Sequence, residues 1–240
     1  MLSPALRHKQ RVNAIKAAEK AAASGVATGA MADSLHLQLI ALEQDMKRLK
    51  ALSRVSDKVA MKRTELIPKY RPYVERYLER VAAGGAAHQN ELFQRLIVWL
   101  FDVGDFETGI TWAELAIAQG QKRPAGIKRD WAHFTADTVL AWAEEEAALG
   151  HAIDPWFSRV FALVKHQWRL NEQASAKWYK LAGCLLLRDD SGKPRPSAVG
   201  DRATLEAADA LLAQAHAYHK KIGVETLRQK ITMRLRALSA

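Results

Sequence analysis

Several residue types and motifs are scarce in this sequence, and their scarcity excludes whole classes of protein. The 240 residues include one cysteine, Cys184, so neither a disulfide framework nor a cysteine zinc site can form within one chain. We expect Cys184 to be a small core residue, because leucines follow it in KLAGCLLL. No apolar run reaches the ~18 residues that would cross a membrane, and MLSPALRHKQRV at the N-terminus lacks the apolar core of a signal peptide. These absences predict a cytosolic protein.

Motifs of nucleotide-driven and hydrolytic enzymes are also missing. The sequence has neither GxxxxGK(S/T) nor GxGxxG, and its histidines never form HExxH or accompany a recognisable serine or cysteine nucleophile motif. His216 and His219 share a helix face, a spacing that is more typical of solvent-facing residues than of metal ligands. We therefore expect no cofactor and assign no catalytic residue.

Aromatic residues are absent from residues 1–69, and all seven tryptophans lie in the later part of the chain. A platform that stacks single-stranded nucleic acid places aromatic side chains among basic ones, and the N-terminal third has no such arrangement. The tryptophans are expected to anchor the core or an interface, because each large ring contributes heavily to burial.

Positive charge is concentrated at the N-terminal end. The chain carries a formal net charge of +10; residues 1–80 hold 16 Lys and Arg against 8 Asp and Glu, and residues 81–240 hold 20 against 18. Such a localised excess is typical of proteins that bind a polyanion, because neutralising phosphates releases condensed counterions. Solvated, lysine-rich helix faces are the alternative explanation.

The residue pattern predicts an all-α fold. Helix-forming residues dominate, no period-2 strand is evident, and glycine and proline stand at punctuation points. We expect residues 1–30 to be a mobile basic helix and linker, residues 31–85 a long amphipathic helix with a proline-delimited helix, and residues 86–240 a body of helical hairpins. The expected helices of this body span 89–102, 106–119, 130–149, 155–170, 172–187, 201–219 and 223–238.

One long amphipathic helix is predicted from about residue 35 to residue 59. Its apolar residues recur at three- and four-residue steps and resemble a coiled-coil seam. We expect Pro68 and Pro72 to end this helix, and the next helix to stop at Gly84 and Gly85. The seam is the predicted oligomerisation surface and contains Leu35, Leu39, Leu42, Met46, Leu49 and Leu52.

Three acids surround Gly104 in FDVGDFETGITWAEL. If antiparallel helices flank them, Gly104 supplies the positive φ that ends the first helix, Asp105 caps the second, and Glu107 lies in its first turn. The arrangement is similar to a tetratricopeptide hairpin. The alternative is a divalent metal site for a nuclease, formed by Asp102, Asp105 and Glu107. The local turn accounts for all three acids, so we assign no metal ligand.

Four stretches resemble the small terminase subunit of temperate, cohesive-end tailed phages with contractile tails and of related prophages. They are SPALRHKQRV, RLKALSRVSDKVAMKRTELIPKYRPYV, VWLFDVGDFETGITWAELAIAQG and the pattern beginning KLAGCLLLRDD. Their order and spacing extend over nearly the whole chain. The resemblance implies a ring-forming homo-oligomer in the cytoplasm of the bacterial host, with double-stranded viral DNA and the large terminase subunit as partners.

Three functions remain open from the sequence. The first is a small terminase subunit that recognises viral DNA and regulates the large motor and nuclease subunit during packaging. The second is a metal-dependent endonuclease subunit that directs cohesive-end cleavage, although the sequence shows no independent nuclease centre. The third is a helical-repeat adaptor that binds only protein. For the first, the candidate DNA-binding residues are basic side chains of the N-terminal third: Arg7, Lys9, Arg11, Lys16, Lys47, Arg48, Lys50, Arg54, Lys58, Lys62 and Arg63.

Overall fold

A computed structural model describes residues 29–189 and 192–239, with side chains from residue 35 onward. These residues form helices and connecting loops, with one isolated β-bridge between Arg188 and Pro194. The predicted all-α fold is therefore confirmed, while the tetratricopeptide-like arrangement and the predicted domain limits stay predictions. The basic helix expected at residues 4–23 lies outside the described residues. In the described part, no helix has the length and apolarity needed to cross a membrane.

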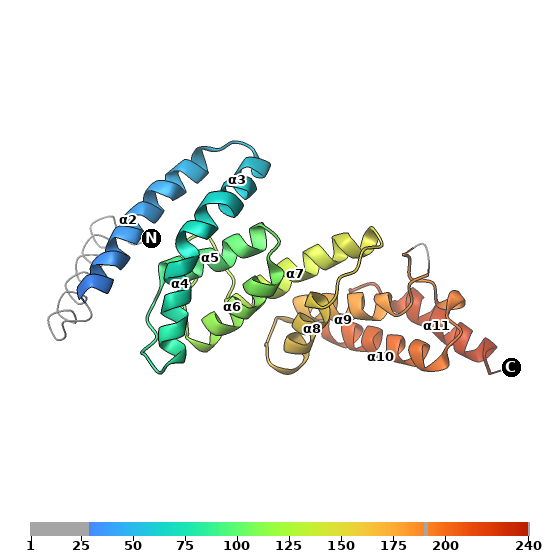
Figure 1. Ribbon diagram of the computed structural model, residues 1–240. Helices are drawn as coiled ribbons and strands as arrows, with labels where there is room; N and C mark the ends of the chain where they lie inside the picture. The colour runs from blue at the N-terminus through green and yellow to red at the C-terminus, as the bar shows by residue number, and fades with distance from the viewer. Residues whose placement is uncertain (1–28, 190–191, 240) are drawn as a thin grey trace. The chain divides into compact units, whose positions relative to one another are not determined.

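The described residues divide into two compact units, with the boundary between Val103 and Gly104. In the first unit, α2 (Gly29–Ala51) is followed by α3 (Val55–Met61), a π-helical segment η1 (Lys62–Leu66), α4 (Ile67–Ala82) and α5 (Glu91–Asp102). Figure 1 shows α2 lying beside the run from α3 to α4, with the short connection between them at one end. The chain reverses direction at this connection.

The prediction of one continuous helix from residue 35 to residue 59 was wrong. Helix α2 ends at Ala51, and Arg54 is extended, with φ −87° and ψ 139°, before α3 begins. The reversal allows the seam to be buried within the unit, where Leu42 is 2% exposed and Leu49 is 6% exposed. Tertiary packing has here overridden the local helical pattern, because burial of an amphipathic face contributes more than propensity.

The two prolines do not end a helix, which is a second correction. Pro68 lies in the first turn of α4, where its missing N–H is no loss, and Pro72 lies inside α4. The preceding segment η1 is wound as a π-helix, in which Ile67 N–H bonds to the Lys62 carbonyl. Helix α4 then ends where predicted, at Ala82, and Gly84 has φ +93°.

Helices α4 and α5 form the core of the first unit. Tyr70 and Val74 on α4 and Phe93, Leu96 and Ile97 on α5 are fully buried. The rings of Tyr70 and Trp99 lie 6.3 Å apart, and the Tyr77 hydroxyl donates to the His88 carbonyl at 2.9 Å. These contacts hold α4 against α5 and the loop that precedes it.

The described residues of the second unit form six α-helices and a short 3₁₀ turn, and the predicted helices agree with them closely. They are α6 (Phe106–Ala118), α7 (Trp131–Ala148), α8 (Trp156–His166), α9 (Glu172–Leu185), η2 (Pro196–Ala198), α10 (Arg202–Tyr218) and α11 (Glu225–Ala237). Asp105, Asp130, Asn171 and Asp201 each cap the helix that follows by accepting backbone N–H bonds. Each capping residue directly precedes the helix that it caps, so the starts of these helices could be predicted from the sequence.

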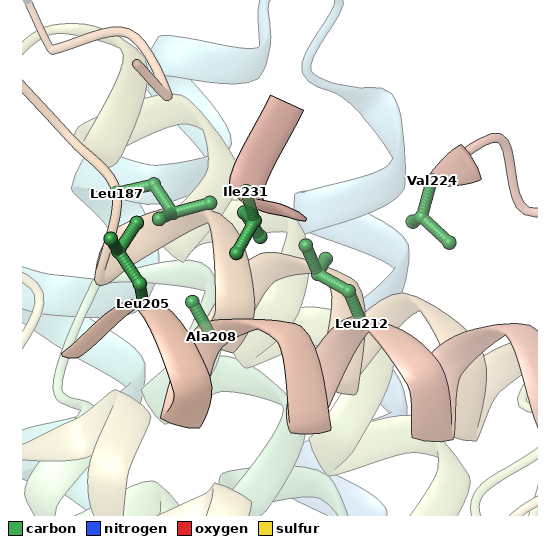
Figure 2. Close-up of a cluster of buried hydrophobic side chains, with 6 residues drawn as sticks. All are labelled: Leu187, Leu205, Ala208, Leu212, Val224 and Ile231. Atoms are coloured by element: carbon green, nitrogen blue, oxygen red, sulfur yellow. The ribbon is translucent and has the colours of Figure 1, made fainter. Parts of the chain in front are cut away.

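Helices α9, α10 and α11 enclose an apolar cluster at the C-terminal end of the second unit. Its buried members are Leu187, Leu205, Ala208, Leu212, Val224 and Ile231. Figure 2 shows Leu205, Ala208 and Leu212 along α10, with Leu187 and Ile231 above them. Cys184, predicted as a core residue, is half-buried at the edge of this cluster, and burial raises the pKa of its thiol.

Candidate nucleic-acid interface

Basic side chains line a groove formed by α2 and α3. The groove has a volume of about 410 Å³, and its lining residues are Glu43, Met46, Lys47, Leu49, Lys50 and Lys58. Lys47 and Lys50 are three residues apart on α2, so they share one face of that helix. Lys58 reaches the same groove from α3. The groove therefore combines an apolar floor with positive charge from both helices.

Four of the predicted DNA-binding cations have no ion-pair partner within the described residues. Lys47, Lys50 and Arg54 are exposed, and Lys58 is half-exposed. No carboxylate of the described residues forms an ion pair with Lys47, Lys50, Arg54 or Lys58. Arg54 lies in the connection between α2 and α3, next to the groove residues in sequence. All four charges therefore remain available to an external anion.

The other three described candidates make contacts inside the first unit. Arg48 bonds to Asp45 and to Glu65, both at 3.0 Å. Lys62 pairs with Asp102 at 2.7 Å, and Arg63 donates to the Val103 carbonyl at 2.8 Å. A cation that bonds to a carbonyl at the end of α5 also interacts favourably with the helix dipole. Arg48, Lys62 and Arg63 thus hold the helices that present the four unpaired cations.

Asp45, which the sequence analysis did not single out, anchors α2 to α4. Its carboxylate is buried and accepts bonds from Lys69 and from the Tyr70 hydroxyl, each at 2.7 Å, in addition to Arg48. Burial by itself would raise the pKa of Asp45, but the hydrogen bonds from Lys69, Tyr70 and Arg48 outweigh it and hold the pKa below its usual value. The same contact raises the pKa of Tyr70, through burial first and the bond to Asp45 second. The available signal was an acid spaced three residues from Leu42 and four from Leu49, on the apolar face of α2.

The predicted oligomerisation residues differ in how deeply they are buried. Leu42 and Leu49 are buried inside the first unit, and Leu35, Leu39, Met46 and Leu52 are half-buried. The most exposed apolar side chains of α2 lie on another face, with Leu37 62% and Ile40 42% exposed. Oligomerisation through α2 stays a prediction, and these two residues are the better probes of it.

The remaining candidate cations, Arg7, Lys9, Arg11 and Lys16, lie outside the described residues. A DNA contact by this segment stays a prediction.

The acids near Gly104 have the structural roles that the turn interpretation predicted. Gly104 has φ +80°, and the Asp105 carboxylate accepts the Thr108 N–H at 3.1 Å. Asp102 pairs with Lys62 in the first unit, and Glu107 pairs with Arg159 at 3.0 Å in the second unit. Among the described residues, no group of three or more His, Cys, Asp and Glu is arranged to hold a metal ion.

Arg159 was missed as a central residue of the second unit. From α8 it reaches three partners on α6: Glu107, Thr111 at 3.0 Å and Glu114 at 2.5 Å. The three partners are four and three residues apart, so they line one face of α6. This network joins α6 to α8, which explains the role of Glu107 without a metal ion.

A basic loop between α6 and α7 was also missed. Residues 121–130 read QKRPAGIKRD and contain four cations and one acid. The net charge of +2 over residues 81–240 does not reveal this loop, because acidic residues elsewhere in that range offset its positive charge. A shorter window would have found it.

Comparisons with known proteins place the chain in a family. The family described as "Phage small terminase subunit" matches residues 39–173, which include α3 to α8 and most of α2. The chain is 38% identical over 200 residues to the "Probable terminase, endonuclease subunit" of Haemophilus phage HP1 (strain HP1c1), covering 83% of this chain and 70% of that protein. It is 29% identical over 215 residues to the "Terminase, endonuclease subunit" of Escherichia phage P2, covering 90% of this chain and 81% of that protein. No solved structure matches it. Because the family match spans more than half of the sequence, and the relative from phage HP1 is matched over more than two thirds of both chains, the chain belongs to the phage small terminase subunit family.

Proposed function

We propose that this protein recognises viral DNA and regulates the large motor and nuclease subunit of a terminase during genome packaging. The observation that carries the proposal is the set of four unpaired cations on α2, α3 and their connection, Lys47, Lys50, Arg54 and Lys58. These residues lie inside the segment that matches the family.

The four cations favour duplex DNA for electrostatic reasons. Each ammonium or guanidinium that neutralises a phosphate releases condensed counterions, and this release supplies much of the binding free energy. Arg54 has a second capability, because a guanidinium can bond bidentately to the edge of a guanine, whereas a lysine acts as a point charge. The absence of aromatic residues from residues 1–69 argues against stacking on single strands.

The test is the salt dependence of DNA binding by the full chain. Changing Lys47, Lys50, Arg54 and Lys58 together to alanine removes up to four phosphate contacts. The slope of log affinity against log salt should then become shallower by up to about 3.6, since each phosphate contact contributes about 0.9. Fluorescence anisotropy with a duplex that contains the packaging site, at several salt concentrations, measures this slope.

A matched control removes four exposed lysines of the second unit, Lys177, Lys220, Lys221 and Lys230. This control has the same net charge as the test variant, so a difference between them reflects position and not total charge. If the control loses the affinity and the test variant keeps it, the interface lies near the C-terminus and the assignment to α2 and α3 is wrong. An affinity that does not depend on salt in the unchanged protein would favour the adaptor that binds only protein.

The segment that precedes α2 is part of the proposal. Its cations Arg7, Lys9, Arg11 and Lys16 add to the positive charge of the N-terminal third. Deleting residues 1–24 should weaken duplex binding without lowering the unfolding midpoint of the remaining chain. A fragment of residues 70–240 that binds as tightly as the full chain at equal salt would contradict the assignment.

The names of the two relatives favour a second candidate function, an endonuclease subunit. Asp102, Asp105 and Glu107 would carry it, but Asp105 caps α6 and the other two acids form ion pairs with basic side chains. Nicking of supercoiled packaging-site DNA by the purified chain with Mg²⁺, in the absence of a large subunit, tests this function. Nicking that disappears in Asp102→Ala, while unfolding stays cooperative, would establish it.

Partners follow from the same proposal. We expect the protein to assemble with further copies of itself, as a ring, and with the large terminase subunit in the cytoplasm of the bacterial host. Support comes from family membership and from the exposed apolar residues Leu37 and Ile40 on α2. Native mass spectrometry of the purified chain gives the number of copies directly.

A further inference from the structure

The loop between α6 and α7 places two basic pairs on either side of a tight turn. Lys122 and Arg123 precede the turn, and Lys128 and Arg129 follow it. The Ile127 N–H bonds to the Pro124 carbonyl at 3.2 Å, and Gly126 has φ +100° at the third position of the turn. Glycine tolerates this positive φ without strain. The turn brings the two basic pairs toward one another.

Both ends of the loop are tied to the second unit. The buried ring of Trp131 donates its Nε1–H to the Gln121 carbonyl at 3.0 Å, and the Gln121 N–H bonds to the Ala116 carbonyl at 2.9 Å. Pro124 is buried although its neighbours are exposed. The loop is therefore held in shape, and its charged groups keep defined positions.

Arg123 and Lys128 are two cations of the loop that form no ion pair with a described residue. The guanidinium of Arg123 bonds across the loop to the Lys128 carbonyl. A carbonyl is neutral, so this bond positions the guanidinium without cancelling its charge. The Lys128 ammonium is exposed and forms no ion pair with a described residue. Asp137 pairs with Arg129, and Asp130 bonds to His133 and also interacts electrostatically with Arg123 without forming an ion pair with it.

We propose that this loop is a second contact for the phosphate backbone of duplex DNA, built by Arg123 and Lys128 and held in shape by Trp131. The inference rests on the proposed function, which needs contacts of the first unit only. Two held cations without an ion-pair partner fit a phosphate, since the guanidinium offers a planar fork of donors and the ammonium a point charge. Each unit of the chain then contributes its own contact to DNA.

The test compares two double variants of the full chain by DNA binding at several salt concentrations. Arg123→Ala with Lys128→Ala should make the slope of log affinity against log salt shallower by about 1.8, which corresponds to two phosphate contacts. The control, Lys177→Ala with Lys230→Ala, removes the same charge from exposed positions of the same unit and should change the slope by less than half as much. An unchanged slope in the loop variant, or an equal change in both variants, overturns the inference.

Trp131→Phe tests whether the shape of the loop matters. This change removes the bond to the Gln121 carbonyl and leaves every charge in place. Affinity should fall at least threefold if the loop is a built contact, and should not change if only a diffuse field acts. If Trp131→Phe unfolds the protein, as circular dichroism would show, the comparison of the double variants decides alone.

Two further outcomes separate this inference from the proposed function. A normal slope in the loop variant together with a shallower slope in the α2 and α3 variant rejects the loop contact and leaves the proposed function standing. Normal DNA binding by the loop variant together with lost association with the large terminase subunit also rejects it, because the loop then binds an acidic protein surface. If neither set of cations affects the slope, both proposals fail.

Discussion

The hydroxyl of Tyr70 donates a hydrogen bond to the carboxylate of Asp45 over 2.7 Å, and both side chains are buried although their residues are 25 positions apart. This bond seats α2 on α4. The groove cations of α2 are therefore positioned by a polar contact beneath them as well as by leucines. Loss of the contact should affect stability first and DNA binding second.

Asp45→Ala should lower the free energy of unfolding by about 1–3 kcal/mol at pH 7, because the buried Tyr70 hydroxyl loses its acceptor. The pKa of Asp45 is depressed in the folded state, so its contribution is present above the unfolded pKa of about 4 and is lost as pH falls through the folded pKa. The difference between the unchanged protein and the variant should shrink as pH falls from 7 to 3. Urea unfolding at several pH values measures it.

Tyr70→Phe is the matched control for this prediction. It removes one donor and keeps the bonds of Asp45 to Lys69 and Arg48, so its effect should be smaller than that of Asp45→Ala. A difference that stays constant down to pH 3 would show that the charge on Asp45 contributes nothing.

Asp105→Ala should cost about 1 kcal/mol of stability, because the Thr108 N–H loses its cap. Asp105→Ser keeps an acceptor at the same position and should cost less. DNA affinity should be unchanged in both variants. Folding that stays intact while a DNA-cleaving activity disappears in Asp105→Ala would favour a catalytic acid over a capping residue.

Helix α9 approaches α10 closely at Gly183. A Cβ at this position would lie 2.8 Å from Leu212 Cγ and 3.2 Å from the Ala208 carbonyl oxygen. Overpacking of this kind costs about 1–3 kcal/mol, and the better helix propensity of alanine returns about 1 kcal/mol or less. Gly183→Ala should therefore lower the urea midpoint.

Leu212→Ala gives the Gly183→Ala prediction its control. It removes the side chain that the new methyl group would meet, so the double variant should be more stable than the sum of the two single effects predicts. Additive effects would mean that the helices shift apart at no cost.

Changing Leu37 and Ile40 on α2 to aspartate should lower the mass of the oligomer, because both apolar side chains are exposed and a charge there opposes burial at an interface. Native mass spectrometry is the measurement. Leu42→Asp is the contrast, since Leu42 is buried inside the first unit and its change should unfold that unit. An unchanged mass for the Leu37 and Ile40 variant places the interface elsewhere.

Local signals made most of the second unit predictable. Asp105, Asp130 and Asn171 are residue types that favour helix starts, and each caps the helix that follows it. Gly104 predicts a turn, and its φ is positive in the structure. These features depend on residues within four positions of one another. A reading of the sequence alone can therefore find them.

Long-range packing decided what could not be predicted. The break after Ala51 exists because Leu42 and Leu49 are buried within the unit, and the sequence alone does not say which helix covers a seam. Pro68 and Pro72 lie inside a helical run, with Pro68 in the first turn of α4 directly after the π-helical segment η1. The candidate site could be predicted only in part for the same reason. Its cations could be named from the sequence, but their ion-pair partners, such as Glu65 for Arg48, lie on other helical segments.

Chemical labelling of Cys184 can report local opening of the C-terminal apolar cluster without any substitution in the protein. It is the one thiol of the sequence, it lies against the apolar side chains shown in Figure 2, and its pKa is raised by burial. Only the thiolate reacts with alkylating reagents, so labelling is slow until α9, α10 and α11 separate. The labelling rate therefore reports how often this end of the second unit opens locally. It can be measured on the full chain with DNA present or absent.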